Sequence, residues 1–235
     1  KYLIIMNQQL KRKIFEHEKI NIGYEDLVAT TTESGRTYNT PDGKSYPSIT
    51  TVLSILSEDA IRAWRERVGA EQANMISGKA SRRGTKVHDV LEKYLNNEDT
   101  TKELPHIRQS LENLKPVLDN NIGKIYGLEV PLFSHHLKLA GRCDVIAEFN
   151  GVPSIIDFKT SKYVKKKERI TNYFAQGAAY AIMWEERTGM SIPNVVIIMD
   201  VDHEKPSVFI EHRDNWTKLL EDTIDEYRKR KMFGH

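Results

Sequence analysis

The spacing of hydrophobic residues separates a largely helical first half of the chain from a second half dominated by strands. Helical spacing predicts helices over about 49–57, 58–69, 70–96, 106–121, 171–188 and from 214 onward. Apolar runs predict strands over 125–133, on both sides of Asn150-Gly151, over 195–201 and over 207–211. This order of elements predicts an α/β protein in which helices flank a central mixed sheet.

The first 45 residues differ from the rest because they lack long apolar periodicity. Residues 7–22 predict either a short helix or an arm, and residues 26–46 predict extended segments in which 36–38 pairs with 44–46. We therefore divide the chain into an N-terminal arm and hairpin (1–45) and a domain over 46–235. That domain has a helical part (46–122) and an α/β core (123–235).

Three local features refine the helices. Gly84 is expected to interrupt the helix over 70–96, with Thr85 capping the second helical segment, and Asp214 is expected to cap the last helix. The helix over 58–69 presents Arg62, Arg65 and Arg67 around Trp64. That cluster is either a phosphate-binding face or an ordinary solvated helix surface.

The segment around Asn150-Gly151 predicts a β-hairpin, because this dipeptide favours a two-residue turn between strands. With that loop, Phe149 faces Val152, and the sixth pair places Asp144 opposite Asp157. Residues that face each other in this way lie on the same side of a sheet. Lys159 follows Asp157 by two positions and points the same way.

The two faces of this hairpin differ in chemistry. The core face is predicted to carry apolar side chains, together with Cys143: Val145, Ala147, Phe149, Val152, Ile156 and Phe158. The other face carries Asp144, Asp157 and Lys159 beside Ile146 and Ile155. Facing carboxylates on a half-apolar surface repel, and a divalent cation with a preference for oxygen ligands, Mg²⁺ or Mn²⁺, would relieve the conflict. The alternative is an exposed face with scattered charges.

The overall charge does not indicate a nucleic-acid partner, because the formal net charge is only +2. A local basic run over 162–167 comes directly after the hairpin. It indicates either nucleic-acid contact or a solvated loop. Glu129, in the predicted strand over 125–133, and His88, beside a buried helical stripe, are further candidates for the site. A lone histidine in that setting can also be structural.

The single cysteine excludes an internal disulfide, a cysteine-rich zinc site and an iron–sulfur cluster, and it favours a reducing, intracellular compartment. No apolar run approaches the roughly 18 residues that span a bilayer, so we expect no membrane partner. The first residues lack the order of charged, apolar and small segments that marks a secretory signal.

Over about residues 46–211 the chain resembles the PD-(D/E)XK nuclease superfamily, and within it the RecB-type branch that includes mitochondrial genome maintenance exonucleases and many phage exonucleases. The resemblance rests on segments that occur in the order of that branch: Tyr46-Pro-Ser-Ile-Thr-Thr-Val-Leu, Arg83-Gly-Thr-Lys-Val-His88-Asp-Val-Leu-Glu, Gly141-Arg-Cys-Asp144, Asp157-Phe-Lys-Thr-Ser161 and Gln176-Gly-Ala-Ala-Tyr180. One departure is Asp157, where the branch usually has glutamate. The four-cysteine cluster of some relatives is also absent.

The resemblance implies a role for each matched residue. His88, Asp144, Asp157 and the Phe158 carbonyl would hold one or two Mg²⁺ or Mn²⁺ ions, with Glu129 as a secondary candidate. Lys159 would position or activate the attacking water. Gln176 and Tyr180 would help to place the substrate strand. Apart from the resemblance, further contacts with DNA are expected from residues next to the candidate site and its basic run: Arg82, Arg83, Thr160, Ser161, Lys162 and Lys165.

These features and the resemblance together predict a metal-dependent deoxyribonuclease with a restriction-endonuclease-like α/β core. By analogy it is an exonuclease on single-stranded DNA ends in repair, recombination or replication. No helicase motif is visible, so a helicase or recombination partner would supply any unwinding. Two alternatives remain open, namely an endonuclease on branched or duplex DNA and a non-catalytic DNA-binding subunit that keeps the fold.

Overall fold

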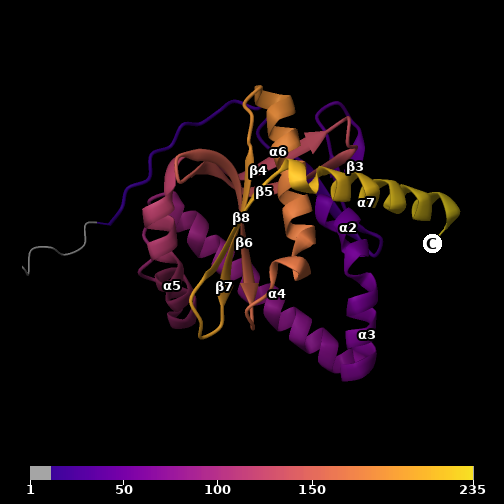
Figure 1. Cartoon of the computed structure of the whole chain (residues 1–235), viewed down its shortest axis with the longest axis horizontal. Coiled ribbons are helices and arrows are strands. Elements are labelled where there is room, and N and C mark those ends of the chain that lie inside the picture. The colour runs from indigo at the N-terminus through magenta and orange to yellow at the C-terminus, as the bar shows by residue number, and fades with distance from the viewer. Residues whose placement is uncertain (1–11, 235) are drawn as a thin grey trace, which may run out of the picture.

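The structure is a computed structural model that describes residues 12–234. Its central feature is a five-stranded sheet between helices (Figure 1). In chain order the elements are β1 (Val28–Thr32), β2 (Gly35–Asn39), β3 (Ser45–Pro47), α2 (Ile49–Leu53), η1 (Ser54–Leu56), α3 (Glu58–Val68), α4 (Ala70–Leu95), α5 (Pro105–Asn121), β4 (Ile122–Ser134), β5 (Leu139–Phe149), β6 (Val152–Ser161), η2 (Lys167–Arg169), α6 (Thr171–Thr188), β7 (Asn194–Val201), β8 (Ser207–His212) and α7 (Asp214–Phe233).

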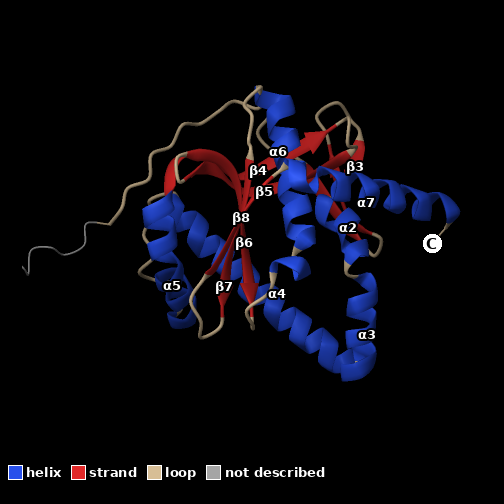
Figure 2. Ribbon diagram, in the orientation of Figure 1, coloured by secondary structure: helices blue, strands red, loops and turns tan. Residues whose placement is uncertain are grey.

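The large sheet is mixed and has the strand order β4-β5-β6-β7-β8. Figure 2 shows this sheet nearly edge-on, with helices on both sides of it. Strands β6 and β7 are parallel and are connected through α6, whereas the other neighbouring pairs are antiparallel. Parallel neighbours need such a crossover, and here a helix provides it. The predicted α/β class, with a mixed central sheet flanked by helices, is confirmed.

Helices cover both faces of the sheet. Apolar residues of α4 and α5 pack on one face with Val145 and Ile156, and those of α2, α6 and α7 pack on the other with Ile146 and Ile155. The prediction that only one hairpin face is core was therefore wrong, because α6 covers the second face. Val152, expected in the core, is 36% exposed beside the turn.

The arm over residues 12–22 contains no helix, and residues 7–11 lie outside the described part of the chain. Its backbone instead bonds to β4, with Glu18 N donating to Ile125 O at 2.8 Å and Ile125 N donating to Glu16 O at 2.9 Å. Phe15 of the arm is buried, and its ring meets that of Tyr94 edge-on with centroids 5.5 Å apart. Bonds to the sheet thus replace the bonds that a helix would make.

Strands β1, β2 and β3 form a separate three-stranded sheet, in which β2 pairs with β3 as predicted and Tyr38 faces Tyr46. Ser48 then caps α2, its side chain accepting a hydrogen bond from Thr51 N at 3.0 Å. The predicted domain boundary between residues 45 and 46 falls inside β3. The division itself stays a prediction.

Two predicted helix boundaries were wrong. Gly84 lies inside a continuous α4, since the buried stripe on its C-terminal side packs on the sheet and outweighs the modest cost of one glycine. Thr85 caps nothing there, and its hydroxyl bonds back to Ser81 O at 3.2 Å. Asp214 is the first residue of α7, and Arg213 occupies the cap position without a capping side-chain hydrogen bond. The Asp214 N–H instead donates to His212 Nδ1 at 3.3 Å.

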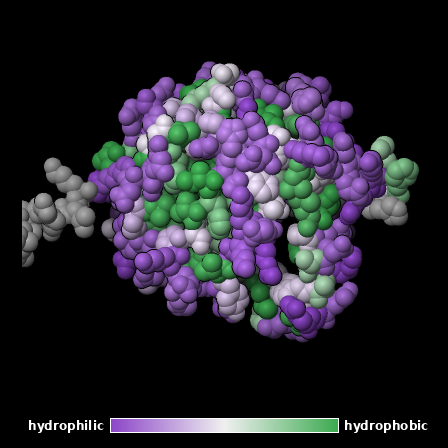
Figure 3. All heavy atoms as spheres, in the orientation of Figure 1, coloured by the Kyte–Doolittle hydropathy of each residue, from purple (hydrophilic) through white to green (hydrophobic). Residues whose placement is uncertain are grey.

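The surface of the described residues is mixed in character. Figure 3 shows hydrophilic side chains over much of one face and a hollow between the side of α2 and α3 and the side of α4 and α6. No helix of residues 12–234 has both the length and the apolar character required to cross a membrane.

Candidate active site

The hairpin of β5 and β6 has the predicted register. Asn150 and Gly151 both have positive φ, 52° and 77°, as a tight two-residue hairpin turn requires. Pairing runs from Phe149 opposite Val152 to Val145 opposite Ile156, and it stops one step before Asp144 and Asp157. Beyond that point the strands leave space for side chains between them.

Asp144 fills part of this space by bonding to the neighbouring strand and to α4. Its Oδ2 accepts a hydrogen bond from Phe158 N at 2.9 Å and lies 3.4 Å from His88 Nδ1. His88 Nε2 in turn lies 2.9 Å from Phe158 O. The Phe158 carbonyl, predicted as a metal ligand, therefore has the histidine ring as its neighbour.

The pair of Asp144 and His88 favours its charged form. Burial disfavours the imidazolium of His88, but the hydrogen bond and the charge of Asp144 outweigh burial and raise the pKa of His88 to about 9. Burial also acts to raise the pKa of Asp144, and the histidine, Lys159 and the Phe158 N–H together lower it below its usual value.

Glu129 reaches the same place through an unusual backbone. Its φ is +48°, a left-handed conformation rare for residues other than glycine, and β4 carries register shifts just before it. Arg142 Nη1 donates to Glu129 O at 2.8 Å, and the same guanidinium pairs with Asp26. Burial, then the charges of Asp144 and Glu92, raise the pKa of Glu129 to about 7.

The ligand atoms of His88, Glu129 and Asp144 all lie within 4.8 Å of one another. Carboxylate oxygens are suitable ligands for Mg²⁺ or Mn²⁺. Burial is the main cause of the raised pKa of Glu129, the charges of Asp144 and Glu92 add to it, and a bound cation would offset both effects. These residues therefore fit a divalent cation. The group does not include Asp157.

Asp157 is instead paired with Lys159. The Lys159 Nζ lies 2.6 Å from Asp157 Oδ2 and 3.5 Å from Gln176 Oε1, and Gln176 Nε2 donates to Asp157 Oδ1 at 3.4 Å. Asp157 is 2% exposed, and burial raises its pKa to about 6. Burial acts to lower the pKa of Lys159, but the charges of Asp157 and Asp144 outweigh it and raise that pKa.

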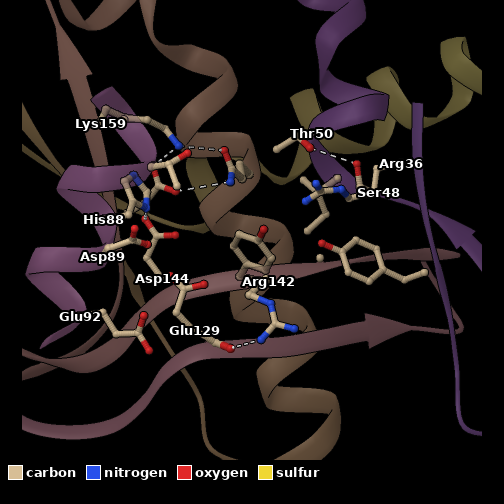
Figure 4. A pocket seen from close by; sticks show the side chains of 18 residues that line it. Arg36, Ser48, Thr50, His88, Asp89, Glu92, Glu129, Arg142, Asp144 and Lys159 are labelled. Atoms are coloured by element: carbon tan, nitrogen blue, oxygen red, sulfur yellow. Dashed lines mark hydrogen bonds and ion pairs between the residues drawn. The ribbon is translucent and has the colours of Figure 1, made fainter. Parts of the chain in front are cut away.

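These groups line one cavity of about 450 Å³. Figure 4 shows Lys159, His88 and Asp144 on one side of it, with Arg36, Ser48 and Thr50 on the other. Tyr180 also lines the cavity and packs against Gly141, where an added Cβ would lie 2.8 Å from the Tyr180 Oη. Glycine is thus needed for this approach of α6 to β5.

The predicted DNA contacts fall into different settings. Arg83 pairs with Asp200, at 2.8 Å between Nη2 and Oδ2, and with Asp202, whereas Arg82 is exposed. Gln176 and Tyr180 line the cavity. The remaining predicted contacts, none of which lines it, are Thr160, Ser161, Lys162 and Lys165.

The end of β6 and the segment that follows it place these last residues outside the cavity. Ser161 is buried, and its hydroxyl donates to Tyr163 O at 2.7 Å, which shapes the turn. Lys162 Nζ lies 5.4 Å from the centroid of the Tyr163 ring, and Tyr163 is 69% exposed. This segment is therefore an exposed basic and aromatic loop next to the site.

Sequence reasoning missed several residues that line the cavity or support it. Arg142 lies inside the Gly141–Asp144 segment, so its place in that motif was an available signal. Arg36, Asp89 and Glu92 also line the cavity. Asp89 and Glu92 end the segment around His88 that resembles the nuclease branch, so that segment was an available signal for them, whereas no local pattern in the sequence marks Arg36.

The fold and this cluster define a nuclease-type site, with acidic residues and a lysine at the point where two central strands separate. Residues 100–233, more than half of the chain, match the profile of a family described as the PD-(D/E)XK nuclease superfamily, and the chain belongs to that superfamily. The matched residues include Glu129, Asp144, Asp157 and Lys159, whereas His88 precedes them.

Two solved structures resemble the chain at low identity. One is a protein from Eubacterium rectale that has been provisionally described as an exonuclease, with 14% identity, a TM-score of 0.44, and coverage of 63% of this chain and 65% of that one. The alignment thus spans slightly less than two thirds of that chain. The other is a protein named SSO0001, with 19% identity, a TM-score of 0.31, and coverage of 62% and 70%. No curated protein matches the sequence.

Proposed function

We propose that the protein is a metal-dependent deoxyribonuclease of the RecB-type branch that removes nucleotides from single-stranded DNA ends. The observation that carries this proposal is that all five segments resembling the branch contribute to one cavity. Its lining includes residues from each of them, namely Ser48, Gly84, His88, Gly141, Asp144, Asp157, Lys159, Gln176 and Tyr180. Segments far apart in sequence thus meet around one set of potential ligands.

Asp144 would hold a Mg²⁺ or Mn²⁺ ion together with His88 and Glu129, which release their protons when the cation binds. Asp157 is a further candidate ligand because its carboxylate lines the same cavity, where it pairs with Lys159. Such a cation, when bound, supplies positive charge at the phosphate oxygens and lowers the pKa of coordinated water. Whether one or two ions bind is left to metal titration.

Lys159 would supply the second positive charge at the scissile phosphate. The contacts of its ammonium with Asp157 and Gln176 hold it in a fixed position, so the charge is in place before the substrate arrives. Its raised pKa favours the protonated form, which suits it to donate a hydrogen bond to a phosphate oxygen or to orient water. Gln176 and Tyr180 would guide the strand beside it.

The test is digestion of end-labelled linear and closed circular single strands with Mg²⁺, Mn²⁺ or EDTA. We expect linear strands to be shortened from an end with either metal, circles to survive, and EDTA to stop the reaction. Cleavage of circles or of branched duplexes would instead establish an endonuclease. Binding without any cleavage would establish the non-catalytic alternative, and RNA substrates in the same assay test the preference for DNA.

Lys159→Ala links this activity to the site. We expect cleavage to fall at least about 10²-fold, because a preorganised positive charge is lost from the transition state. The matched control is Lys218→Ala, which removes one lysine whose side chain is 84% exposed on α7. Equal activity of the two variants would contradict the assignment, and circular dichroism checks that both fold.

Two further aspects of the proposal concern the cell. A DNA-unwinding or recombination partner would deliver single strands to this protein, and a reducing intracellular compartment would suit its buried free thiol at Cys143. Co-purification and localisation of the tagged protein test these expectations.

A further inference from the structure

The cavity contains four basic side chains, and they differ in whether a carboxylate neutralises them. Lys159 pairs with Asp157, His88 with Asp144, and Arg142 with Asp26. The fourth is Arg36, and among residues 12–234 no carboxylate forms an ion pair with it. Arg36 is thus the cavity's available cation.

Hydrogen bonds fix the backbone of Arg36 against the N-terminus of α2. Its N–H donates to Thr51 Oγ1 at 3.0 Å, and its carbonyl accepts from Ser48 N at 2.7 Å. Gly35 permits this close approach, since its φ is +115° and an added Cβ would lie 2.4 Å from Thr51 Cγ2. The chain thus holds the start of β2 firmly against α2.

The guanidinium is held at one end only. Arg36 Nε donates to Thr31 Oγ1 at 3.2 Å on the neighbouring strand β1, and no hydrogen bond engages the Nη1 and Nη2 groups within the described residues. Figure 4 shows Arg36 near Ser48 and Thr50, across the cavity from His88, Asp144 and Lys159. Two terminal donors are therefore available to an anion in the cavity.

The cavity wall opposite Arg36 is acidic, so a positive charge at Arg36 would help a DNA strand to bind. Acidic side chains dominate it: Asp89, Glu92, Glu129, Asp144 and Asp157. A phosphodiester strand entering the cavity meets this negative charge, which a bound cation offsets only at the scissile phosphate. A planar guanidinium with two free donors can bind a neighbouring phosphate in bidentate fashion.

We propose that Arg36 binds a non-scissile phosphate of the substrate strand, so that the N-terminal sheet forms one wall of the DNA-binding channel. This inference rests on the proposed nuclease function and adds a subsite to it. The ligand is the phosphodiester backbone, and the contact is independent of base sequence. Thr50, exposed beside Arg36, adds a hydroxyl to the same wall.

The experiment measures binding of a fluorescent single-stranded oligonucleotide by anisotropy in EDTA over a range of salt concentrations. For Arg36→Ala we expect binding to weaken about 10-fold, because a charged hydrogen-bonded contact is lost. The slope of log K against log salt should become shallower by about 0.7, the value for one phosphate contact on a single strand. With Mg²⁺, KM should rise while kcat is retained.

Three control variants make the result specific. Lys44→Ala removes a positive charge from the turn directly before β3, outside the cavity lining, and should leave the salt slope unchanged. Thr31→Ala removes only the hydrogen bond to Nε and should keep the slope, since the charge remains. Arg36→Lys should keep the slope and lose part of the affinity.

The outcomes separate the two proposals. Wild-type protein that neither binds nor cleaves DNA overturns the nuclease function. Wild-type protein that cleaves DNA, with Arg36→Ala showing the wild-type slope and KM, overturns the Arg36 subsite alone. Lower thermal stability of Arg36→Ala with an unchanged slope, or an equal loss of slope in Lys44→Ala, also overturns the subsite.

Discussion

At the scale of single residues, the site depends on how Glu129 is held. A glutamate at φ +48° occupies a sparsely populated region, and such a conformation persists only where surrounding contacts enforce it. Arg142 provides that contact, since it bonds to the Glu129 carbonyl and is itself held by Asp26. We therefore regard Arg142 as a positioning residue for the carboxylate.

Arg142→Ala tests this role. Without the guanidinium, the Glu129 backbone can relax and move its carboxylate out of the group with His88 and Asp144. We expect Mn²⁺ affinity to fall about 10- to 100-fold, as is usual when a residue supporting a ligand is lost. Isothermal titration calorimetry measures the affinity, and Asp26→Asn should give a smaller loss in the same direction. Unchanged Mn²⁺ affinity in Arg142→Ala would contradict the role of Arg142 in positioning Glu129.

At the scale of elements, α4 matters most, because it carries His88 to the sheet. Arg83 fixes the helix one turn earlier by pairing with Asp200, which is 3% exposed at the end of β7 and also accepts from Asn113 Nδ2 at 3.1 Å. This pairing favours a structural function for Arg83. The sequence instead predicts that Arg83 contacts DNA, because it lies close to His88 in the chain.

Arg83→Ala distinguishes the two interpretations. Removing the guanidinium leaves the buried Asp200 carboxylate without its charge partner, so the free energy of unfolding should fall by about 3 kcal/mol. Urea denaturation measures it. Arg82→Ala removes the adjacent exposed arginine and should change stability by less than about 0.5 kcal/mol. Unchanged stability with weakened DNA binding in Arg83→Ala would support the DNA contact instead.

Two glycines inside helices give a paired test of packing. An alanine Cβ at Gly84 would lie 3.7 Å from Thr160 Oγ1, an ordinary contact, so Gly84→Ala should stabilise the protein by up to about 1 kcal/mol. At Gly177 the Cβ would lie 2.2 Å from Val195 Cγ1, and Gly177→Ala should destabilise it by about 1–3 kcal/mol. Thermal unfolding of both variants checks the opposite signs.

At the scale of the whole molecule, the two layers of helices shield both faces of the sheet from solvent. They also shield the thiol of Cys143, which lies in β5. Cys143 is fully buried. We predicted that it packs on the same face as Val145, but it packs on the opposite face of the sheet, with residues of α6. Burial raises the pKa of its thiol well above the usual value.

A thiol reagent should therefore report global unfolding. We expect no reaction of the native protein with 5,5′-dithiobis(2-nitrobenzoic acid) at pH 8, and one thiol per chain titrated in urea. The rate should follow the unfolding transition seen by circular dichroism. Fast reaction of the native protein would mean that the layer formed by α6 opens readily.

The sequence predicted the parts of this molecule that depend on local signals. Asn150-Gly151 determines the hairpin register, and Gly189, with φ +70°, ends α6 where expected. It could not predict contacts between residues far apart, such as Arg83 with Asp200. Nor could it show that Glu129 would approach Asp144, because that depends on irregular pairing of β4. The ligand and DNA-contact roles of the predicted residues remain to be tested.

The absence of a side chain at Gly141 has a consequence for the shape of the cavity. A single methyl group there would collide with the phenol of Tyr180, and relief of that collision would tilt the ring or push α6 outward. Residue 141 thus acts as a spacer between strand and helix, and the spacing depends on one missing carbon atom. Enlarging this residue would shift one wall of the cavity without replacing any candidate metal ligand.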